Sequence, residues 1–299
     1  MRIVEYQAVR DGVTVERLLR QQGVSHRLLT ALKKDPEGLT VDGKPVRSID
    51  RLSQGQSLRM QVREIDRSDI KPQKGLMLSI LYEDEDLFVV DKPAGMAVHP
   101  SMNNRDNTVA NALAALYQER GLPFAFRAIG RLDKNTSGLL VLAKNPLSAC
   151  LLTEAAQKKQ MYHTYLAACM GQLPPQGTID APIARAPGSV ILRCVSPDGE
   201  RAVTHFTRLA VQDECSLARV RLETGRTHQI RVHFQYIGHP LVGDHLYNPH
   251  QTRMDRHALH AASLTLPQPI SGELLHFYAP LPADMRELFG DVIEAQKTP

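Results

Sequence analysis

The first periodic pattern of apolar and polar residues along the chain has the spacing of a helix. In residues 13–23, VTVERLLRQQG, apolar side chains recur at helical spacing, and Gly23 is a typical residue just beyond a helix C-terminus. Residues 25–35, SHRLLTALKKD, repeat this spacing with Ser25 at the N-cap position. The pattern predicts two short helices, each with one apolar face.

A small sheet is predicted after these helices. Residues 38–48, GLTVDGKPVRS, have the alternation of a hairpin with Asp-Gly at its turn, and residues 52–64 predict a further turn and strand. Residues 68–77 are polar, contain Pro and Gly, and have no sustained period, which indicates a linker. We therefore expect a compact module over residues 1–67 and a separate domain over residues 78–299.

In the larger domain, helical and strand patterns are mixed. Residues 107–121 predict a helix with Asn107 as its cap, and residues 145–159 predict another that opens with Asn145 followed by proline. Strand patterns occur at 80–93, 164–173, 189–196, 202–211 and 215–224. A run of strands with inserted helices predicts an α+β fold with a mixed, largely antiparallel central sheet and flanking helices.

One more helix is predicted in residues 223–247, ETGRTHQIRVHFQYIGHPLVGDHLY. Thr227 is its expected cap, and the helix runs to about Tyr236. Arg231 lies next to the apolar face, where its guanidinium can reach a buried partner, and Arg226 precedes the N-terminus, a position that favours phosphate oxygens. An ordinary amphipathic helix with solvated arginines is the alternative.

An acidic and a basic residue stand where the chain enters an apolar run. In residues 130–145, GRLDKNTSGLLVLAKN, Arg131 and Asp133 lie one leucine apart in a Gly- and Asn-containing turn, which an uninterrupted apolar stretch follows. A buried strand can hold such a loop rigidly, which is typical of active-site residues.

The charge is unevenly distributed. Residues 1–77 hold 15 Lys/Arg and 10 Asp/Glu, whereas the whole chain has a net charge of only +4. A basic module indicates a polyanion-binding role, with an ordinary solvated surface as the alternative. Six basic side chains fall on or between the two predicted helices: Arg17, Arg20, His26, Arg27, Lys33 and Lys34.

Several chemistries lack their usual sequence patterns. The chain has no phosphate-binding loop, no dinucleotide fingerprint, no HExxH and no GxSxG, so we expect no cofactor. Seven of the 12 histidines lie between residues 228 and 260, but their spacing matches no compact metal motif. The N-terminus has no signal-peptide pattern, no stretch approaches a membrane span, and four widely separated cysteines fit reduced thiols. We expect a cytoplasmic protein, a monomer without membrane contact.

The order of the N-terminal elements resembles the S-four family of RNA-binding modules. The resemblance rests on GVSHRLLTALKK and LTVDGKPV, although His26 separates the usual Ser-Arg pair and Asp42 replaces the usual Asn. It implies that the basic side chains named above contact RNA.

The rest of the chain is similar to the RluA-type pseudouridine synthases. The segments that carry this resemblance are DKPAGMAVHP, GRLDKNTSGLLVLAKN, TYLAACMGQL, GRTHQIRVHFQYIGHPLVGDHLY and LHAASLTL, over residues 78–284. It implies isomerisation of uridine to pseudouridine in RNA, most often in the 23S ribosomal RNA, after the nucleotide is flipped out of its stack.

The resemblance also implies roles for single residues. Asp133 matches the catalytic aspartate, which acts as a nucleophile or takes a proton, and Tyr165 matches the tyrosine that packs against the base. Arg231 matches the arginine that pairs with the aspartate. Arg131 matches the arginine that helps to hold the flipped nucleotide.

The chain departs from the family pattern at three positions. Gly130 stands where most RluA-type members have His, His163 where Lys is common, and Gln268 where His is usual. Alternatives from other classes are a non-catalytic RNA-binding or ribosome-assembly protein with the same fold, a synthase acting on transfer RNA, and an RNA-processing hydrolase.

Overall fold

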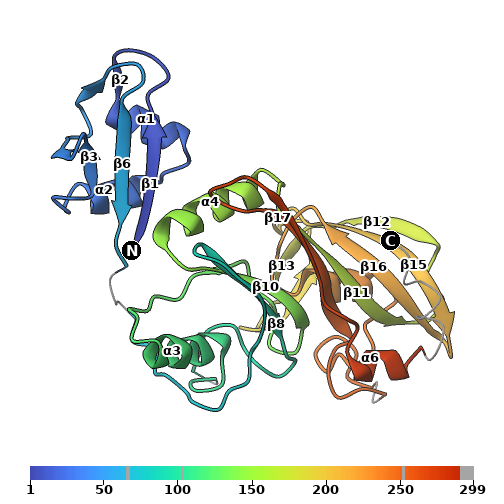
Figure 1. Ribbon diagram of the computed structural model, residues 1–299. Coiled ribbons are helices and arrows are strands. Elements are labelled where there is room, and N and C mark those ends of the chain that lie inside the picture. The colour runs from blue at the N-terminus through green and yellow to red at the C-terminus, as the bar shows by residue number, and fades with distance from the viewer. Residues whose placement is uncertain (65–67, 103, 251–252, 290–299) are drawn as a thin grey trace.

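The computed structural model describes residues 1–64, 68–102, 104–250 and 253–289. A small N-terminal unit stands on one end of a larger body that is built around one long sheet (Figure 1). None of the helices in these residues is long and apolar enough to cross a membrane.

The N-terminal unit contains the predicted helices, α1 (Val15–Gln21) and α2 (His26–Leu32). The Ser25 hydroxyl accepts a hydrogen bond from Leu28 N at 3.2 Å, which confirms the predicted cap. A four-stranded sheet in the order β1-β6-β3-β4 covers these helices, beside a pair formed by β2 (Val13–Thr14) and β5 (Arg51–Leu52). Its strands are β1 (Arg2–Gln7), β6 (Ser57–Val62), β3 (Leu39–Val41) and β4 (Lys44–Pro45). β1 was not predicted.

The larger body contains a ten-stranded sheet. Its strands are β7 (Ser79–Glu83), β8 (Leu87–Lys92), β9 (Ala128–Ile129), β10 (Ser137–Ala143), β11 (Tyr162–Met170), β12 (Gln176–Asp180), β15 (Val203–Gln212), β16 (Cys215–Leu222), β17 (Leu259–Pro267) and β18 (Leu274–Tyr278). Their order is β12-β15-β16-β11-β17-β10-β8-β7, with β18 paired to β17 and β9 to β10. Only β10 and β17 run parallel among these described strands, so the α+β, largely antiparallel prediction is confirmed.

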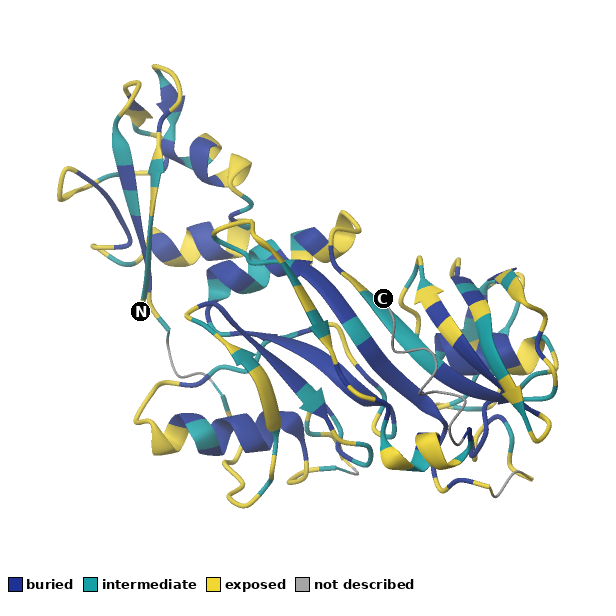
Figure 2. Ribbon diagram, turned by 45° about the vertical axis from the view of Figure 1, so that its right-hand side comes forward, coloured by how far each residue is buried: buried dark blue, intermediate teal, exposed yellow. Residues whose placement is uncertain are grey.

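Helices cover both faces of this sheet near its centre. The even-numbered leucines of β10 pack in one cluster with α3 (Val109–Glu119), and its odd-numbered residues pack in another with α4 (Pro146–Gln157). β10 is therefore apolar on both faces, which explains its uninterrupted apolar run, and Figure 2 shows the central strands as buried. At Gly138 the backbone approaches β17 so closely that a Cβ would lie 2.3 Å from Ala261 O.

The two remaining helices and a small hairpin lie beside the other half of the sheet. They are α5 (Gln229–Tyr236), α6 (Ala283–Glu287), and the pair β13 (Ile183–Arg185) and β14 (Arg193–Val195). The strand predicted over residues 189–196 is too long, because the Ser189 hydroxyl accepts from Ile191 N and Leu192 N and forms a turn. The expected Asn107 cap of α3 is also wrong, since the hydroxyl of Thr108 accepts from Asn111 N at 3.2 Å.

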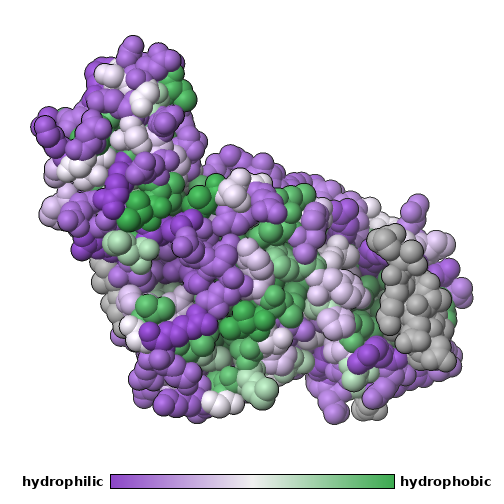
Figure 3. Space-filling view, in the orientation of Figure 1, coloured by the Kyte–Doolittle hydropathy of each residue, from purple (hydrophilic) through white to green (hydrophobic). Residues whose placement is uncertain are grey.

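Apolar side chains join the N-terminal unit to the body. Leu147 of α4 is fully buried in the core of the N-terminal unit, and Leu151 and Ile270 pack against the same cluster. Figure 3 shows apolar residues gathered where the two units meet. The core of the small unit is therefore completed by a helix of the larger body.

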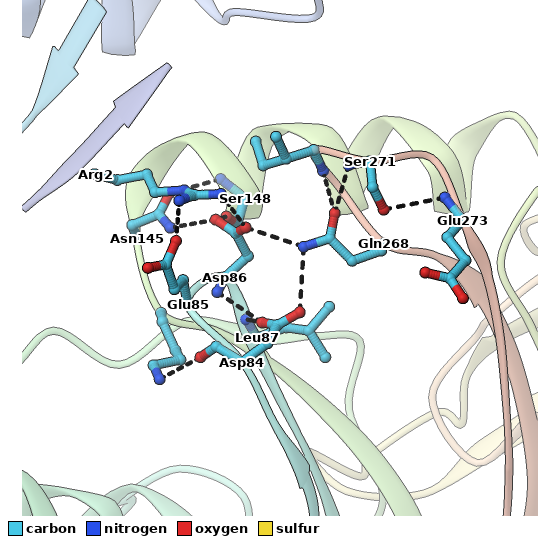
Figure 4. Close-up of polar contacts among 12 residues, drawn as sticks. Arg2, Asp84, Glu85, Asp86, Leu87, Asn145, Ser148, Gln268, Ser271 and Glu273 are labelled. Atoms are coloured by element: carbon cyan, nitrogen blue, oxygen red, sulfur yellow. Dashed lines mark hydrogen bonds and ion pairs between the residues drawn. The ribbon is translucent and has the colours of Figure 1, made fainter.

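A buried carboxylate ties the same junction together (Figure 4). The side chain of Asp86 is 1% exposed and pairs with Arg2 Nη2 of β1 at 2.8 Å. It also accepts from Asn145 Nδ2 at 3.0 Å, Ser148 Oγ at 2.8 Å and Gln268 Nε2 at 3.0 Å. Gln268, one of the departures from the family pattern, therefore has its side chain in this junction.

Residues 68–77, the predicted linker, contain neither helix nor strand. Ile70 and Leu76 pack against the α3 cluster, and Asn111 of α3 donates to Lys71 O at 2.9 Å. The predicted boundary at residue 67 and the C-terminal residues 290–299 lie outside the described residues.

Candidate active site

A cavity of about 630 Å³ opens between β10, β11 and the N-terminus of α5. Five of the predicted site residues line it: Arg131, Asp133, Tyr165, Arg226 and Arg231. The volume falls within the range of small-molecule sites in proteins. The structure thus brings together side chains that are up to 100 positions apart in the sequence.

Buried side chains fix the loop that carries Asp133. Lys92 Nζ donates to Lys134 O at 3.0 Å, Arg256 Nη1 donates to Asn135 O at 3.2 Å, and the next hydroxyl, of Thr136, lies 2.8 Å from His257 Nε2. Three consecutive residues after Asp133 are therefore each held by a different side chain.

Two of these supporting groups have shifted pKa values. Lys92 is fully buried, and its burial lowers its pKa to about 7, although its Nζ also donates to the carbonyl oxygens of Pro93 and Met96. Burial lowers the pKa of His257 to about 3, so its imidazole is neutral near pH 7.

Arg231 links Asp133 to a second carboxylate. Its Nη1 lies 3.1 Å from Asp133 Oδ2, while Nε and Nη2 each lie 2.7 Å from an oxygen of Asp244. Asp244 is fully buried, and Asp133 is 29% exposed in the cavity. Burial alone would lower the pKa of Arg231, but its hydrogen bonds to Asp244 and the charges of both aspartates raise it. The guanidinium is thus a permanent cation beside Asp133.

The turn before α5 differs from the prediction. Thr227 does not cap the helix; His228 occupies the cap position in the left-handed conformation, with φ 59° and no capping side-chain bond. Gln229 instead provides the acceptor for the donors of this turn, because its Oε1 accepts from Arg226 N at 3.0 Å and from the Thr224 hydroxyl at 2.9 Å. A side chain inside the helix therefore organises the segment that precedes it.

A β-bulge directs Tyr165 into the cavity. The register of β11 against β17 shifts between Thr164 and Tyr165, and such bulges re-aim side chains next to active sites. Burial, together with the nearby charge of Asp133, raises the pKa of Tyr165, which keeps the phenol neutral. His163, on the same strand, lies 3.1 Å from Leu139 O through Nε2, and burial lowers its pKa to about 4.

The two other arginines of the cavity differ in their partners. The exposed guanidinium of Arg131 makes no hydrogen bond or ion pair with any residue that the structure describes. Arg226 is ion-paired with Glu200 and donates from Nε to Arg201 O at 3.1 Å. Gly130, beside Arg131, has φ +83° and open space where a Cβ would stand.

The basic residues of the N-terminal unit lie elsewhere. Arg17, Arg20, His26, Arg27, Lys33 and Lys34 are all exposed, and none of them lines the cavity. These six side chains are therefore not part of the cavity.

Sequence reasoning missed Asp244, Lys92 and His228 as parts of the site. The sequence held a signal for Asp244. A buried Arg231 guanidinium has five N–H donors, which Asp133 alone cannot satisfy, so a second acceptor was to be expected. The histidines between 228 and 260 are used singly: in residues 1–64, 68–102, 104–250 and 253–289, no three His, Cys, Asp or Glu side chains form a metal-binding group.

Comparison with known proteins identifies the family of the chain. The family model for RNA pseudouridylate synthase matches residues 86–236, about half of the chain. An uncharacterized RNA pseudouridine synthase of Bacillus subtilis (strain 168), YjbO, is 37% identical over 92% of this chain and 98% of its own length. Ribosomal large subunit pseudouridine synthase D of Escherichia coli (strain K12) is 38% identical over 78% of this chain and 76% of its own length.

Solved structures show the same fold. Human RNA Pseudouridylate Synthase Domain Containing 1 matches 77% of this chain and 98% of its own with a TM-score of 0.60 at 25% identity. Human RNA Pseudouridylate Synthase Domain Containing 4 matches 72% of this chain with a TM-score of 0.56. With these matches and the cavity geometry, the chain belongs to the RluA-type RNA pseudouridine synthases, which are isomerases.

Proposed function

We propose that this chain isomerises uridine to pseudouridine in large-subunit ribosomal RNA, with Asp133 as its catalytic carboxylate. The observation that carries the proposal is the Asp133–Arg231 pair at 3.1 Å in a cavity of about 630 Å³. A carboxylate that is fixed by a guanidinium and still partly exposed can act on a bound nucleoside, either as a nucleophile or as a base.

The reaction exchanges one bond for another. The N1–C1′ bond breaks, the uracil turns while it stays in the cavity, and C5 bonds to C1′. The C5 hydrogen leaves to solvent and N1 takes up a proton, so atoms and charge balance without an oxidant or a cofactor. Asp133 assists by attacking C1′ or the uracil, or by taking a proton from C2′.

Other cavity residues receive roles from their surroundings. A base within a stacked helix cannot turn, so the uridine is flipped out, at a cost of a few kcal/mol. Arg131 lines the cavity, no residue in the described part of the chain pairs with its guanidinium, and it is suited to hold the backbone of the displaced nucleotide. Tyr165 offers a neutral aromatic face for the uracil, whereas Arg226 must exchange Glu200 for a phosphate.

The name of the Escherichia coli relative supports ribosomal RNA as the substrate. The basic N-terminal unit, over residues 1–67, is proposed to be an S-four-like anchor for that RNA, followed by a linker over 68–77 and the catalytic domain over 78–299. Action as a cytoplasmic monomer is part of the same proposal.

The substrate is tested with RNA that carries tritium at uridine C5. Purified protein is incubated, without added cofactor, with transcribed 23S ribosomal RNA, 16S ribosomal RNA or transfer RNA. We expect tritium release to water from 23S RNA alone. Release from transfer RNA alone would contradict the ribosomal target, and binding without release from any RNA would favour the non-catalytic alternative.

The N-terminal anchor is tested by charge removal. Deletion of residues 1–67 would expose Leu147 and its neighbours on α4, so Arg17, Arg20, Arg27, Lys33 and Lys34 are changed together to Gln. We expect weaker RNA binding and a salt dependence that flattens by up to about 0.9 in log–log slope for each lost phosphate contact. Neutralising the exposed Lys158 and Lys159 is the control, and equal slopes for both variants would refute the anchor.

A further inference from the structure

We propose that His228 is a further substrate-contacting residue, whose Nε2–H donates a hydrogen bond to an oxygen of the uridine bound beside Asp133. The inference rests on the proposed function and adds one residue to it. His228 lines the large cavity and also a smaller one of about 240 Å³, and Asp133 lines both. Its imidazole therefore stands beside the reacting carboxylate.

Hydrogen-bond partners favour one position for the imidazole proton. The Tyr247 hydroxyl already accepts from Arg193 N at 3.0 Å, which favours it as the donor to His228 Nδ1, 2.9 Å away. In this assignment Nδ1 accepts, and the neutral imidazole carries its proton on Nε2. Burial lowers the pKa of His228, and Arg231 acts in the same direction, although Asp133 opposes them.

No acceptor of the residues that the structure describes lies within hydrogen-bond distance of this Nε2–H. Asp133 Oδ2, at 3.9 Å, is too far for a direct bond. Among the described residues, Nε2 is also not one of the buried polar atoms that lack a partner, so it is open to the cavity. A donor that is fixed on one side and free on the other is suited to bind a substrate oxygen.

The backbone holds this imidazole in one place. His228 adopts φ 59° and ψ 18°, which non-glycine residues rarely adopt and which recurs at functional sites. The turn is fixed from within by the Gln229 side chain, which also donates from Nε2 to Val203 O at 3.0 Å. The rings of His228 and Tyr247 meet edge to face, with centroids 5.7 Å apart.

Two substitutions test the roles of the two ring nitrogens of His228 separately. His228→Asn keeps an acceptor for Tyr247 at the Nδ1 position and tolerates the left-handed backbone, but it has no group at the Nε2 position. His228→Gln places an amide N–H near Nε2. We expect His228→Asn to lower kcat/KM for tritium release about tenfold or more, with Tm close to wild type, and His228→Gln to recover most of kcat/KM. Wild-type kcat/KM in His228→Asn, or equal losses in both variants, would overturn the proposal.

A measurement without turnover distinguishes this inference from the proposed function. In ¹⁵N NMR of histidine-labelled wild-type protein, we expect His228 as the Nε2–H tautomer, and its Nε2 resonance to shift when a short uridine-containing RNA binds. An Nδ1–H tautomer, or an Nε2 resonance that RNA leaves unmoved, would overturn the inference even in an active enzyme. Failure of the wild type to release tritium would instead refute the proposed function.

Discussion

Asp244 is the residue whose change gives the most informative perturbation of the site. Its carboxylate is fully buried and binds Nε and Nη2 of Arg231 at 2.7 Å each, and it also accepts from Leu246 N at 3.1 Å. Asp244→Asn keeps the shape and one acceptor oxygen, but it removes the charge and turns an N–H group toward the guanidinium. Within the described ranges, Arg231 then keeps Asp133 as its single charged partner.

The expected cost follows from burial. Removing one partner of a buried ion pair destabilises a protein by about 3–5 kcal/mol. Because Asn keeps one hydrogen bond, we expect about 3 kcal/mol, or a fall in Tm of roughly 6–12 °C for a chain of this size. Since Arg231 loses its fixed geometry, we also expect kcat for tritium release to fall about tenfold or more. This kcat is measured at a temperature well below the Tm of the variant.

The assay combines thermal unfolding with single-turnover tritium release. The matched control is Glu83→Gln, which breaks another two-bond carboxylate–guanidinium pair, with Arg120 at 2.5 and 3.0 Å, outside the cavity. That pair is partly exposed, so we expect a loss of about 1 kcal/mol or less and unchanged kcat. Wild-type stability and kcat in Asp244→Asn would refute the claim that Asp244 fixes Arg231.

Three further predictions concern the supports of the site and the junction of the units. His257→Gln should make folding less sensitive to acid. A histidine with a folded pKa of about 3 and an unfolded pKa of 6.5 contributes its full stability above pH 6.5 and loses it as the pH falls toward 3. In urea unfolding, the variant should therefore lose about 1.4 kcal/mol less than wild type between pH 7.5 and 5.5, and equal losses would contradict this. Arg2→Met should lower the free energy of unfolding by about 1–3 kcal/mol, because Asp86 loses its only cationic partner among the described residues. It should also speed proteolysis of the N-terminal unit, and unchanged proteolysis would count against a fixed junction. Lys92→Met should lower single-turnover kcat about tenfold while RNA affinity stays the same, because the backbone carbonyl of Lys134 loses its hydrogen-bond donor. A wild-type kcat would show that the loop is held without Lys92.

Features of the fold that depend on neighbouring residues were predictable from the sequence. The Ser25 and Asn145 caps are found as expected, because a cap depends on residues within one turn. The buried strand β10 follows from an apolar run that can only lie between two covering layers.

Features that depend on distant residues were not predictable. β1 is a strand because Arg2 pairs with Val62 and Gln7 with Ser57, and nothing local in its sequence marks this pairing. The predicted cap at Thr227 failed because the side chain of Gln229, two residues further on, accepts from Arg226 N in the turn, while distant contacts to Val203 O and the Thr204 hydroxyl hold that side chain in place.

The candidate site was predicted in its residues but not in its support. Asp133, Tyr165 and Arg231 were inferred from motif positions, and the structure places all three at one cavity. Asp244 lies in the same segment, residues 223–247, as Arg231, yet the contact between them depends on how the chain folds back after α5. Their catalytic roles stay predictions until they are measured.

The measurement that tests the central claim most directly is single-turnover tritium release by Asp133→Asn beside the wild type, on the same C5-labelled 23S RNA. Asn is close in shape to Asp and can still accept from Arg231, so the fold and RNA affinity should match those of the wild type. We predict that release falls by about a thousandfold or more, because neither covalent attack nor proton removal is open to the amide. Release within about tenfold of the wild-type rate would contradict the assignment of Asp133 as the catalytic carboxylate.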